Sequence, residues 1–232
     1  MLKGNKFIVL LILAGVAYIM FNLLSGYTEK DQLSEVAQYY AAPENVESVN
    51  AQNLVTAVVV TYRGLDTLGE VTILFLTAAI IGYFLKGKGT GRKVRETSEI
   101  LKTSSAVLVP VIILLGVYVF VNGHLTPGGG FQGGAIIASG VALLLLSSPT
   151  LDFRFSPFTI VESISGLVFI GAGLLGIILA GGFLDNRIME MGKFGTLLSA
   201  GAIPVIYTFV GLKVGSELSN ILGKLQTAQQ EK

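Results

Sequence analysis

The sequence has 232 residues, of which 52% are hydrophobic and only 13% are charged, and its mean hydropathy is +0.71. Soluble domains carry about 25% charged residues, so the composition predicts an all-α integral membrane protein. The net charge of +1 gives no reason to expect a nucleic-acid partner. Absence of cysteine and a single histidine exclude disulfides, thiolate sites and multi-histidine metal or haem sites, so we expect no metal and no cofactor in this chain.

The first apolar run, residues 7–24, is long enough to span a bilayer. Lys3 and Lys6 precede it, as in a signal peptide, but the run is long for one and no small-residue cleavage site follows. We therefore expect a retained membrane anchor. Residues 25–52 are polar and acidic, which predicts a solvated loop on the outer side.

The next segment, residues 53–85, is too long for one membrane helix. As a continuous helix it would measure about 50 Å, against an apolar core of about 30 Å. The expected break is at Arg63 and Gly64, with a second span at 68–85. If the chain is helical after the break, Arg63, Asp66 and Glu70 share one face because their spacings are three and four.

A basic stretch follows and divides the chain into two expected modules. Residues 86–103 hold six basic and two acidic side chains, among glycines that favour flexibility. We expect a two-helix module at 1–90, a cytoplasmic linker at 91–103 and a four-helix module at 104–232. The apolar runs predict further spans at 107–121, 134–146, 161–179 and 196–212. Pro110 is expected in the first turn of its helix, where proline is tolerated, and Glu162 near the start of its own.

Residues 120–140, FVNGHLTPGGGFQGGAIIASG, carry the densest glycine cluster and the only histidine, His124. Pro127 ends the preceding run, and the glycines allow positive φ and close backbone approach. Irregular backbone at membrane depth persists only where protein or a water-filled cavity covers it. We expect a turn or shallow re-entrant segment packed inside a protein complex. Its members are Pro127, Gly128, Gly129, Gly130, Phe131, Gly133 and Gly134. A nucleotide site is not expected, because no strand context or nearby basic residue accompanies the glycines.

The string GHLTPGGGFQGGAI resembles the signature of the B subunit of Mrp-type multisubunit Na⁺/H⁺ antiporters, a module also found in archaeal membrane-bound hydrogenases and sulfur-reducing complexes. The resemblance covers roughly residues 100 to 215. The upstream segment resembles the small E-type subunit of those complexes and the C-terminal tail of the antiporter A-type subunit, whose RGLDTLGE-like pattern it follows at 63–70. Where that pattern has NVVN, this chain reads NLVT at 53–56, and Tyr62 precedes Arg63.

Six spans would place both termini on one side of the membrane. Twelve Lys and Arg residues then lie on the side of the termini and four on the other, so both termini are expected to be cytoplasmic. The glycine turn and the Arg63–Glu70 segment would fall near the same outer face, although they belong to different modules. We expect a multi-pass protein of the cell membrane whose partners are lipid and other membrane subunits.

Candidate ion-translocation residues follow from these positions. Glu70 would lie about one turn inside the apolar region, where an acid is a functional hypothesis by default, either as a relay or as a partner of Arg63. Asp66 and Thr67 offer oxygen ligands for Na⁺, while Arg63 and Asp66 also fit an interfacial salt bridge. His124 is either a proton-sensitive group or, as we favour, an interfacial histidine bonded to a turn carbonyl.

The resemblance implies a non-catalytic membrane subunit that contributes to cation translocation coupled to proton transfer, with Na⁺ and H⁺ as transported ions. The order of the two modules favours a hydrogenase-like or sulfur-reducing respiratory complex. The alternatives are a subunit of a stand-alone Na⁺/H⁺ antiporter and a purely structural membrane spacer. A self-sufficient transporter is disfavoured, because no repeat relates the two halves.

Overall fold

The computed structural model describes residues 2–27, 32–85, 97–151 and 153–230, and the secondary structure within them is helical. Contacts divide the chain into two compact units, residues 1–39 and 40–232. Most of the basic linker, residues 86–96, lies outside the described residues. The first unit contains helix α1 (Leu2–Ser25) and most of helix α2 (Glu35–Ala41). Helix α1 is apolar around its whole circumference, as expected of a membrane anchor.

The second unit begins with short pieces and then a long helix, as the break at Arg63 predicted. Helix α3 (Pro43–Val49) and helix α4 (Leu54–Thr56) lead into a π-helix, η1 (Ala57–Tyr62), and then into α5 (Gly64–Leu85). Arg63 leaves the helical conformation at φ −122° and ψ 36°, and its N–H bonds the carbonyl of Val58. The expected break between residues 53–62 and the span is therefore confirmed.

The remaining helices form the second half of this unit. They are α6 (Glu99–Val121), α7 (Gly130–Ser147), α8 (Phe155–Ala180), the short 3₁₀ helix η2 (Asn186–Ile188) and α9 (Ile203–Gln230). The side chain of Ser98 caps α6 by accepting from the N–H of Leu101, so this helix begins well before the apolar run. The expectation that Pro110 lies in a first turn is wrong, since it lies inside α6. Helix α7 begins at Gly130, four residues before the predicted span at 134–146.

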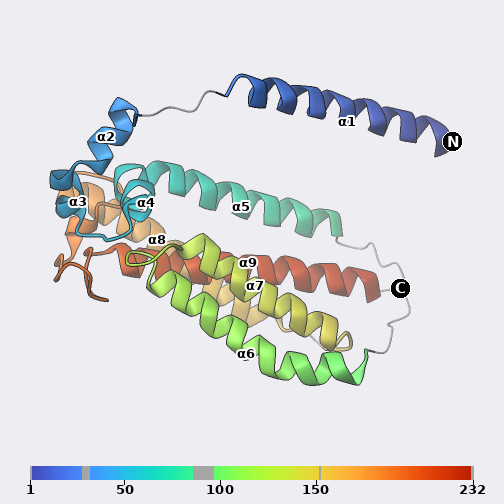
Figure 1. Cartoon of the computed structure of the whole chain (residues 1–232). Coiled ribbons are helices and arrows are strands. Elements are labelled where there is room, and N and C mark those ends of the chain that lie inside the picture. Colours follow the sequence, from blue (N-terminus) through green and yellow to red (C-terminus); the bar gives the residue numbers. More distant parts are fainter. Residues whose placement is uncertain (1, 28–31, 86–96, 152, 231–232) are drawn as a thin grey trace. The chain divides into compact units, whose positions relative to one another are not determined.

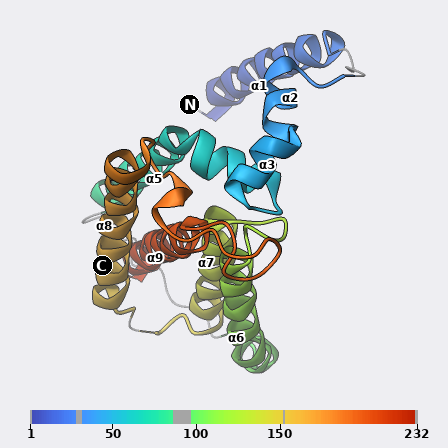
Figure 2. The same cartoon turned by 90° about the vertical axis from the view of Figure 1, so that its left-hand side faces the viewer.

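Helix α9 is the central element of the second unit. Helices α5, α6, α7 and α8 all pack against it, and α6 also packs along α7. Figure 1 shows α9 running between α5 and the α6–α7 pair, and Figure 2 shows it beside α7 and α8 when the bundle is turned. Its neighbours bury Ile203, Ile206, Tyr207, Val210 and Val214 almost completely. Protein rather than lipid therefore surrounds most of this helix.

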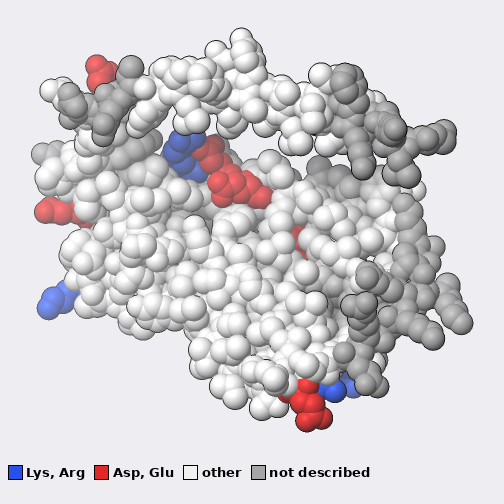
Figure 3. Space-filling view, turned by 45° about the vertical axis from the view of Figure 1, so that its right-hand side comes forward, with Lys and Arg blue, Asp and Glu red and all other residues white. Residues whose placement is uncertain are grey.

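Five helices of the described residues are long and apolar enough to cross a membrane. They are α1, α5, α6, α7 and α8. Helix α9 is not among them, and the predicted bounds of a span at 196–212 are wrong: residues 196–202 form turns, and the helix runs from Ile203 to Gln230. The surface in Figure 3 is mostly uncharged, with acidic and basic side chains confined to a few places, as expected of a lipid-facing protein.

Candidate functional site

The glycine turn joins α6 to α7 and packs tightly against α9. The N–H groups of Leu125 and Thr126 both bond the carbonyl of Asn122 at 2.9 Å, which closes the first part of the turn. Gly128 and Gly129 have φ values of 149° and 157°, which L side chains rarely adopt. A Cβ atom on Gly130 would lie 2.7 Å from Cβ of Val210 in α9. The glycines therefore serve both the turn conformation and close contact with the central helix.

The other predicted members of the turn occupy the same junction. A Cβ on Gly133 would meet the carbonyl oxygen of Gly116 in α6 at 2.5 Å, and one on Gly134 would meet Cβ of Val214 in α9 at 2.7 Å. Phe131 packs against the hydrophobic core, whereas Pro127 is exposed at the tip of the turn. The start of α7 is thus wedged between α6 and α9 with backbone in contact on both sides.

Asn53 attaches the upstream segment to this turn. Its side-chain amide donates to the carbonyls of Gly123 and Thr126, each at 2.9 Å, and its backbone N–H donates to the carbonyl of His124 at 2.9 Å. The same side chain accepts from the N–H groups of Val55 and Thr56 and so caps α4. One residue therefore starts a helix of the first predicted module and holds a turn of the second.

Thr56 and Tyr207 extend this hydrogen-bond network into the core. Thr56 is fully buried; its hydroxyl donates to the carbonyl of Gly123 at 2.6 Å and accepts from the Tyr207 hydroxyl at 3.2 Å. The ring of Tyr207 also lies against Gly123 and Gly129. The threonine that replaces the second asparagine of the NVVN-like pattern thus bonds the turn directly. The structure brings the upstream segment and the glycine turn together, as topology suggested.

His124 lies completely buried in the glycine turn. Its Nε2 is 3.3 Å from the carbonyl oxygen of Thr196, and Nδ1 has no hydrogen-bond partner among the described residues. Burial lowers the pKa of His124 below its ordinary value of 6.5, although backbone hydrogen bonds act in the opposite direction. Burial therefore favours the neutral imidazole in the folded chain. Its role in proton transfer stays a prediction.

The charged side chains at the start of α5 pair with each other at the surface. Arg63 and Asp66 form a salt bridge of 2.5 Å, and their side chains are 62% and 55% exposed. Such exposed pairs contribute little to stability. Thr67 is buried, and its hydroxyl donates to the carbonyl of Val59 in the π-helix at 2.7 Å. Thr67 thus satisfies a carbonyl next to the break, where π-helical turns alter the ordinary bonding pattern.

Glu70 is exposed on the surface of this unit, one turn beyond Asp66. No salt bridge joins it to Arg63 among the described residues, because Arg63 bonds Asp66 instead. Its charge lies close enough to Tyr207 to act on the phenol electrostatically. Glu70 is therefore exposed on α5, where lipid, water or a neighbouring protein would meet it.

A second loop completes this end of the bundle. Asn186 is buried and donates to the carbonyls of Val49 and Ala200, while Asn50 donates to the carbonyl of Met191 at 2.6 Å. Burial alone would raise the pKa of Asp185. Its hydrogen bonds and charge interaction with Arg187 together outweigh this effect, so the pKa lies below its ordinary value.

Sequence reasoning missed Asn53, Thr56 and Tyr207 as the residues that seat the turn. The NLVT motif at 53–56 was the available signal, but nothing in it specified a partner. It also misread Glu162 as a residue that starts a helix: α8 begins at Phe155, about two turns earlier. The predicted span at 196–212 ended before Lys213 and Glu217, which are buried inside the bundle.

Two family descriptions match this chain. The family "Domain related to MnhB subunit of Na+/H+ antiporter" matches residues 100–220, and the MbhE family, the E-type subunit of MBH, matches residues 3–104. The uncharacterized protein MJ1307 of Methanocaldococcus jannaschii is 30% identical over 196 residues, covering 72% of this chain and 74% of that protein. The B-type subunit of the Na(+)/H(+) antiporter of Bacillus subtilis is 37% identical over 82 residues, covering 35% of this chain and about half (54%) of that protein.

Two solved structures share the fold. A chain of the membrane-bound sulfane sulfur reductase, an archaeal respiratory membrane complex, superposes with a TM-score of 0.79 at 36% identity, covering 97% of this chain and 98% of that one. A chain of the Mrp complex from Dietzia sp. DQ12-45-1b superposes with a TM-score of 0.75 at 23% identity, covering 96% of this chain but 26% of the other. The first family match, over residues 100–220, covers more than half of the chain. The chain therefore belongs to the family of proteins with a domain related to the MnhB subunit of Na⁺/H⁺ antiporters, joined here to an MbhE segment.

Proposed function

We propose that this chain is a non-catalytic membrane subunit of an Mrp-type antiporter-like module within a respiratory complex of the sulfur-reducing or hydrogenase kind. The observation that carries the proposal is the superposition on one chain of the sulfane sulfur reductase over 97% of this chain and 98% of the other. Both family matches lie in one polypeptide here, in the order MbhE segment and then MnhB-related domain. The alternative of a stand-alone antiporter is supported by the shorter likeness to the Bacillus subtilis protein.

In the membrane, we place six spans and both termini on the cytoplasmic side. Helix α9 is the sixth span: its 28 residues are long enough to cross, and the surrounding helices shield its polar side chains from lipid. Lys213 is buried in the bundle, so it no longer counts among the basic residues of the loops. Of the remaining fifteen Lys and Arg residues, eleven lie on the side of the termini. The glycine turn and the Arg63–Glu70 segment then lie toward the outer face.

Within this subunit, Glu70 is our candidate for contact with the translocated cation. It is an exposed carboxylate on a span, beside a turn whose backbone carbonyls are already bonded by Asn53 and Thr56. Because an uncompensated charge at that depth is expensive, a cation, water or a polar group of a neighbouring protein must meet it. Asp66 and Thr67 supply additional oxygens one turn away, and Na⁺ and H⁺ are the ions we expect to pass.

The assignment to a complex is tested by purification from the native membrane. A chain tagged at its C-terminus and extracted in mild detergent should bring down antiporter-like membrane subunits together with soluble redox subunits. Antiporter-like subunits without redox subunits would instead favour the stand-alone antiporter. Recovery of this chain alone, under conditions that keep a known respiratory complex intact, would contradict membership in either assembly.

A further inference from the structure

The centre of the bundle holds an ion pair that the candidate site does not use. Lys213 Nζ donates to Glu217 Oε2 at 2.7 Å, and the two side chains are only 8% and 1% exposed. Both lie on α9, four residues apart, where α5 and α8 pack over them. Buried ion pairs cost desolvation energy and are often replaceable by apolar residues without loss of stability. A role in stability alone is therefore a weak explanation for this pair.

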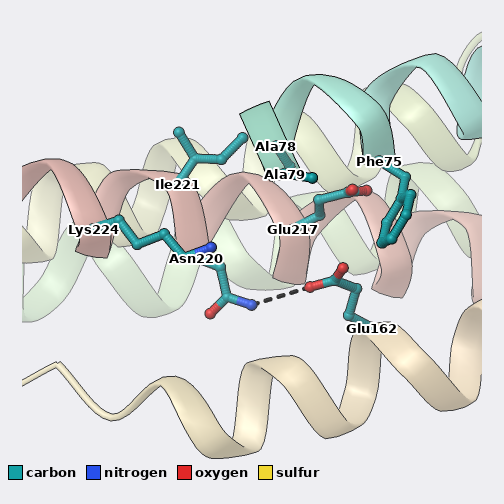
Figure 4. A pocket seen from close by; sticks show the side chains of 8 residues that line it. All are labelled: Phe75, Ala78, Ala79, Glu162, Glu217, Asn220, Ile221 and Lys224. Carbon is teal, nitrogen blue, oxygen red and sulfur yellow. Dashed lines mark hydrogen bonds between the residues drawn. The ribbon is translucent and has the colours of Figure 1, made fainter. Parts of the chain in front are cut away.

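Glu217, but not Lys213, lines a pocket of about 190 Å³ between α5, α8 and α9. Figure 4 shows Glu162 of α8 and Glu217 of α9 directed toward the same space, with Phe75 of α5 beside them. Asn220 donates to Glu162 Oε2 at 3.1 Å, whereas Glu217 Oε1 is buried without a hydrogen-bond partner among the described residues. A buried carboxylate oxygen without a partner among the described residues, on the wall of a cavity, indicates that the cavity receives a proton, water or ion.

The dimensions and charges of the pocket distinguish among these occupants. A water molecule takes about 30 Å³ in the liquid, so several fit, and the four polar side chains of the wall, Glu162, Glu217, Asn220 and Lys224, offer bonding partners. Two carboxylates and one ammonium group, those of Glu162, Glu217 and Lys224, line the pocket, and a second ammonium group, that of Lys213, pairs with Glu217. A hard cation prefers a shell of oxygens and would meet two positive charges here. Equal numbers of acids and bases around water suit proton exchange better than cation binding.

Helices α5, α6 and α7 contribute no charged residue to the wall of the pocket, although α5 carries Asp66 and Glu70 nearer its start. Helix α5 contributes Phe75, Ala78 and Ala79 to the wall, and α6 and α7 carry charged residues only in the first turn of α6, at Glu99 and Lys102. At one end of the pocket Lys224 is exposed, and its chain lies over Gly82 of α5, whereas Glu217 at the other end is buried. The pocket therefore has the buried carboxylate of Glu217 at one end and the exposed ammonium group of Lys224 at the other.

We propose that this pocket is a proton-exchange site inside the protein, with Glu217 as the group that takes up and releases the proton. A hydronium ion in the pocket transfers a proton to Glu217 Oε1 and becomes water. The carboxylate of Glu217 becomes a carboxylic acid, which releases Lys213 from a fully charged pair. The proton then passes through water to Glu162, whose carboxylate Asn220 holds in place, and Glu217 returns to its charged form. No electrons move. The proposal rests on the proposed function in one respect only: the antiporter-like module supplies the proton gradient.

The first test is an infrared pH titration of the purified full-length chain in lipid. The wild-type chain should show a protonated-carboxyl C=O band that titrates and shifts in deuterated water. Glu217→Gln should abolish this band, whereas Glu190→Gln, which removes an exposed acid in the loop before α9, should leave it unchanged. A band that survives in Glu217→Gln would overturn the proposal. Because this readout needs no other protein, its outcome is independent of whether the chain belongs to the proposed complex.

The second test measures proton transport by the whole complex in proteoliposomes. Glu217→Gln should lower the rate by about a hundredfold or more, at or above the lower end of the usual range for loss of a proton-transfer group, while the Glu190→Gln complex keeps the wild-type rate. If Glu217→Gln fails to assemble, the double variant Lys213→Met with Glu217→Leu removes both charges and should assemble, since apolar pairs replace buried ion pairs well. Wild-type transport by either assembled variant, or failure of both to assemble, would show that the pair is structural.

Discussion

Replacing Asn53 with alanine removes the side chain that holds the glycine turn against the upstream segment. The substitution deletes two hydrogen bonds of 2.9 Å, to the carbonyls of Gly123 and Thr126, and the cap on the N–H groups of Val55 and Thr56. Each hydrogen bond contributes about 1 kcal/mol and the cap about 1 kcal/mol. We expect Asn53→Ala to lower the free energy of unfolding by about 3 kcal/mol, because three separate contributions are lost.

Two further variants divide this cost. Asn53→Asp keeps the acceptor that caps α4 but cannot donate to the two carbonyls, so it should cost about 2 kcal/mol. Asn122→Ala is the matched control: among the described residues its side-chain amide donates to the carbonyl of Tyr118 in α6, at a partly exposed position, and the substitution should cost about 0.5 kcal/mol or less.

The assay is denaturant unfolding of the purified full-length chain in micelles, followed by circular dichroism. If Asn53→Ala and Asn122→Ala unfold within about 0.5 kcal/mol of each other, then Asn53 does not hold the turn. A cost confined to Asn53→Ala, with Asn53→Asp equal to the wild type, would assign the effect to the cap alone.

Three other predictions concern the turn, the topology and pH. Gly130→Val should prevent stable assembly, because its side chain would collide with α9, while insertion of the spans stays intact; wild-type amounts of active complex would refute this. Single cysteines at Ser48 and Glu190, both exposed, should react with an impermeant thiol reagent from outside in sealed cells, and one at Thr97 should not; labelling at Thr97 would reverse the topology. The pKa of His124 is lowered on folding, so the unfolded chain binds more protons than the folded chain as the pH drops through 6.5. The free energy of unfolding should therefore fall as the pH drops through that value, and His124→Gln should lose this dependence. An unchanged pH profile in the variant would contradict the prediction.

The break after Tyr62 and the glycine turn were predictable because local chemistry determines both. A 33-residue segment cannot fit one span, and Gly64 marks the place where the helix restarts. Pro127 and the three glycines after it cannot continue α6, and Gly128 and Gly129 adopt positive φ in the structure. The start of α6 was missed because the apolar run was taken as the helix, although Ser98 carried a capping signal.

The course of α9 could not be predicted from hydropathy, because that measure assumes that a spanning helix faces lipid. Neighbouring helices enclose α9, so Lys213 and Glu217 can continue it where an isolated span would have to end. Glu162 was placed at the start of its helix because the start of α8 was predicted too late. Arg154 at the start of α8 makes no side-chain cap, so no sequence signal marked that helix as beginning before Pro157. Which residues face one another across helices is a tertiary property that one sequence does not specify.

The measurement that tests the central claim most directly is Na⁺-dependent transport by complexes that carry Glu70→Gln. The substitution keeps size and hydrogen bonding but removes the charge, and Arg63 should remain paired with Asp66 in its presence. We predict normal assembly together with a fall in Na⁺-dependent transport of about tenfold or more, which Arg63→Gln should not restore. Normal Na⁺-dependent transport in the assembled Glu70→Gln complex would contradict the account and leave this chain a structural spacer.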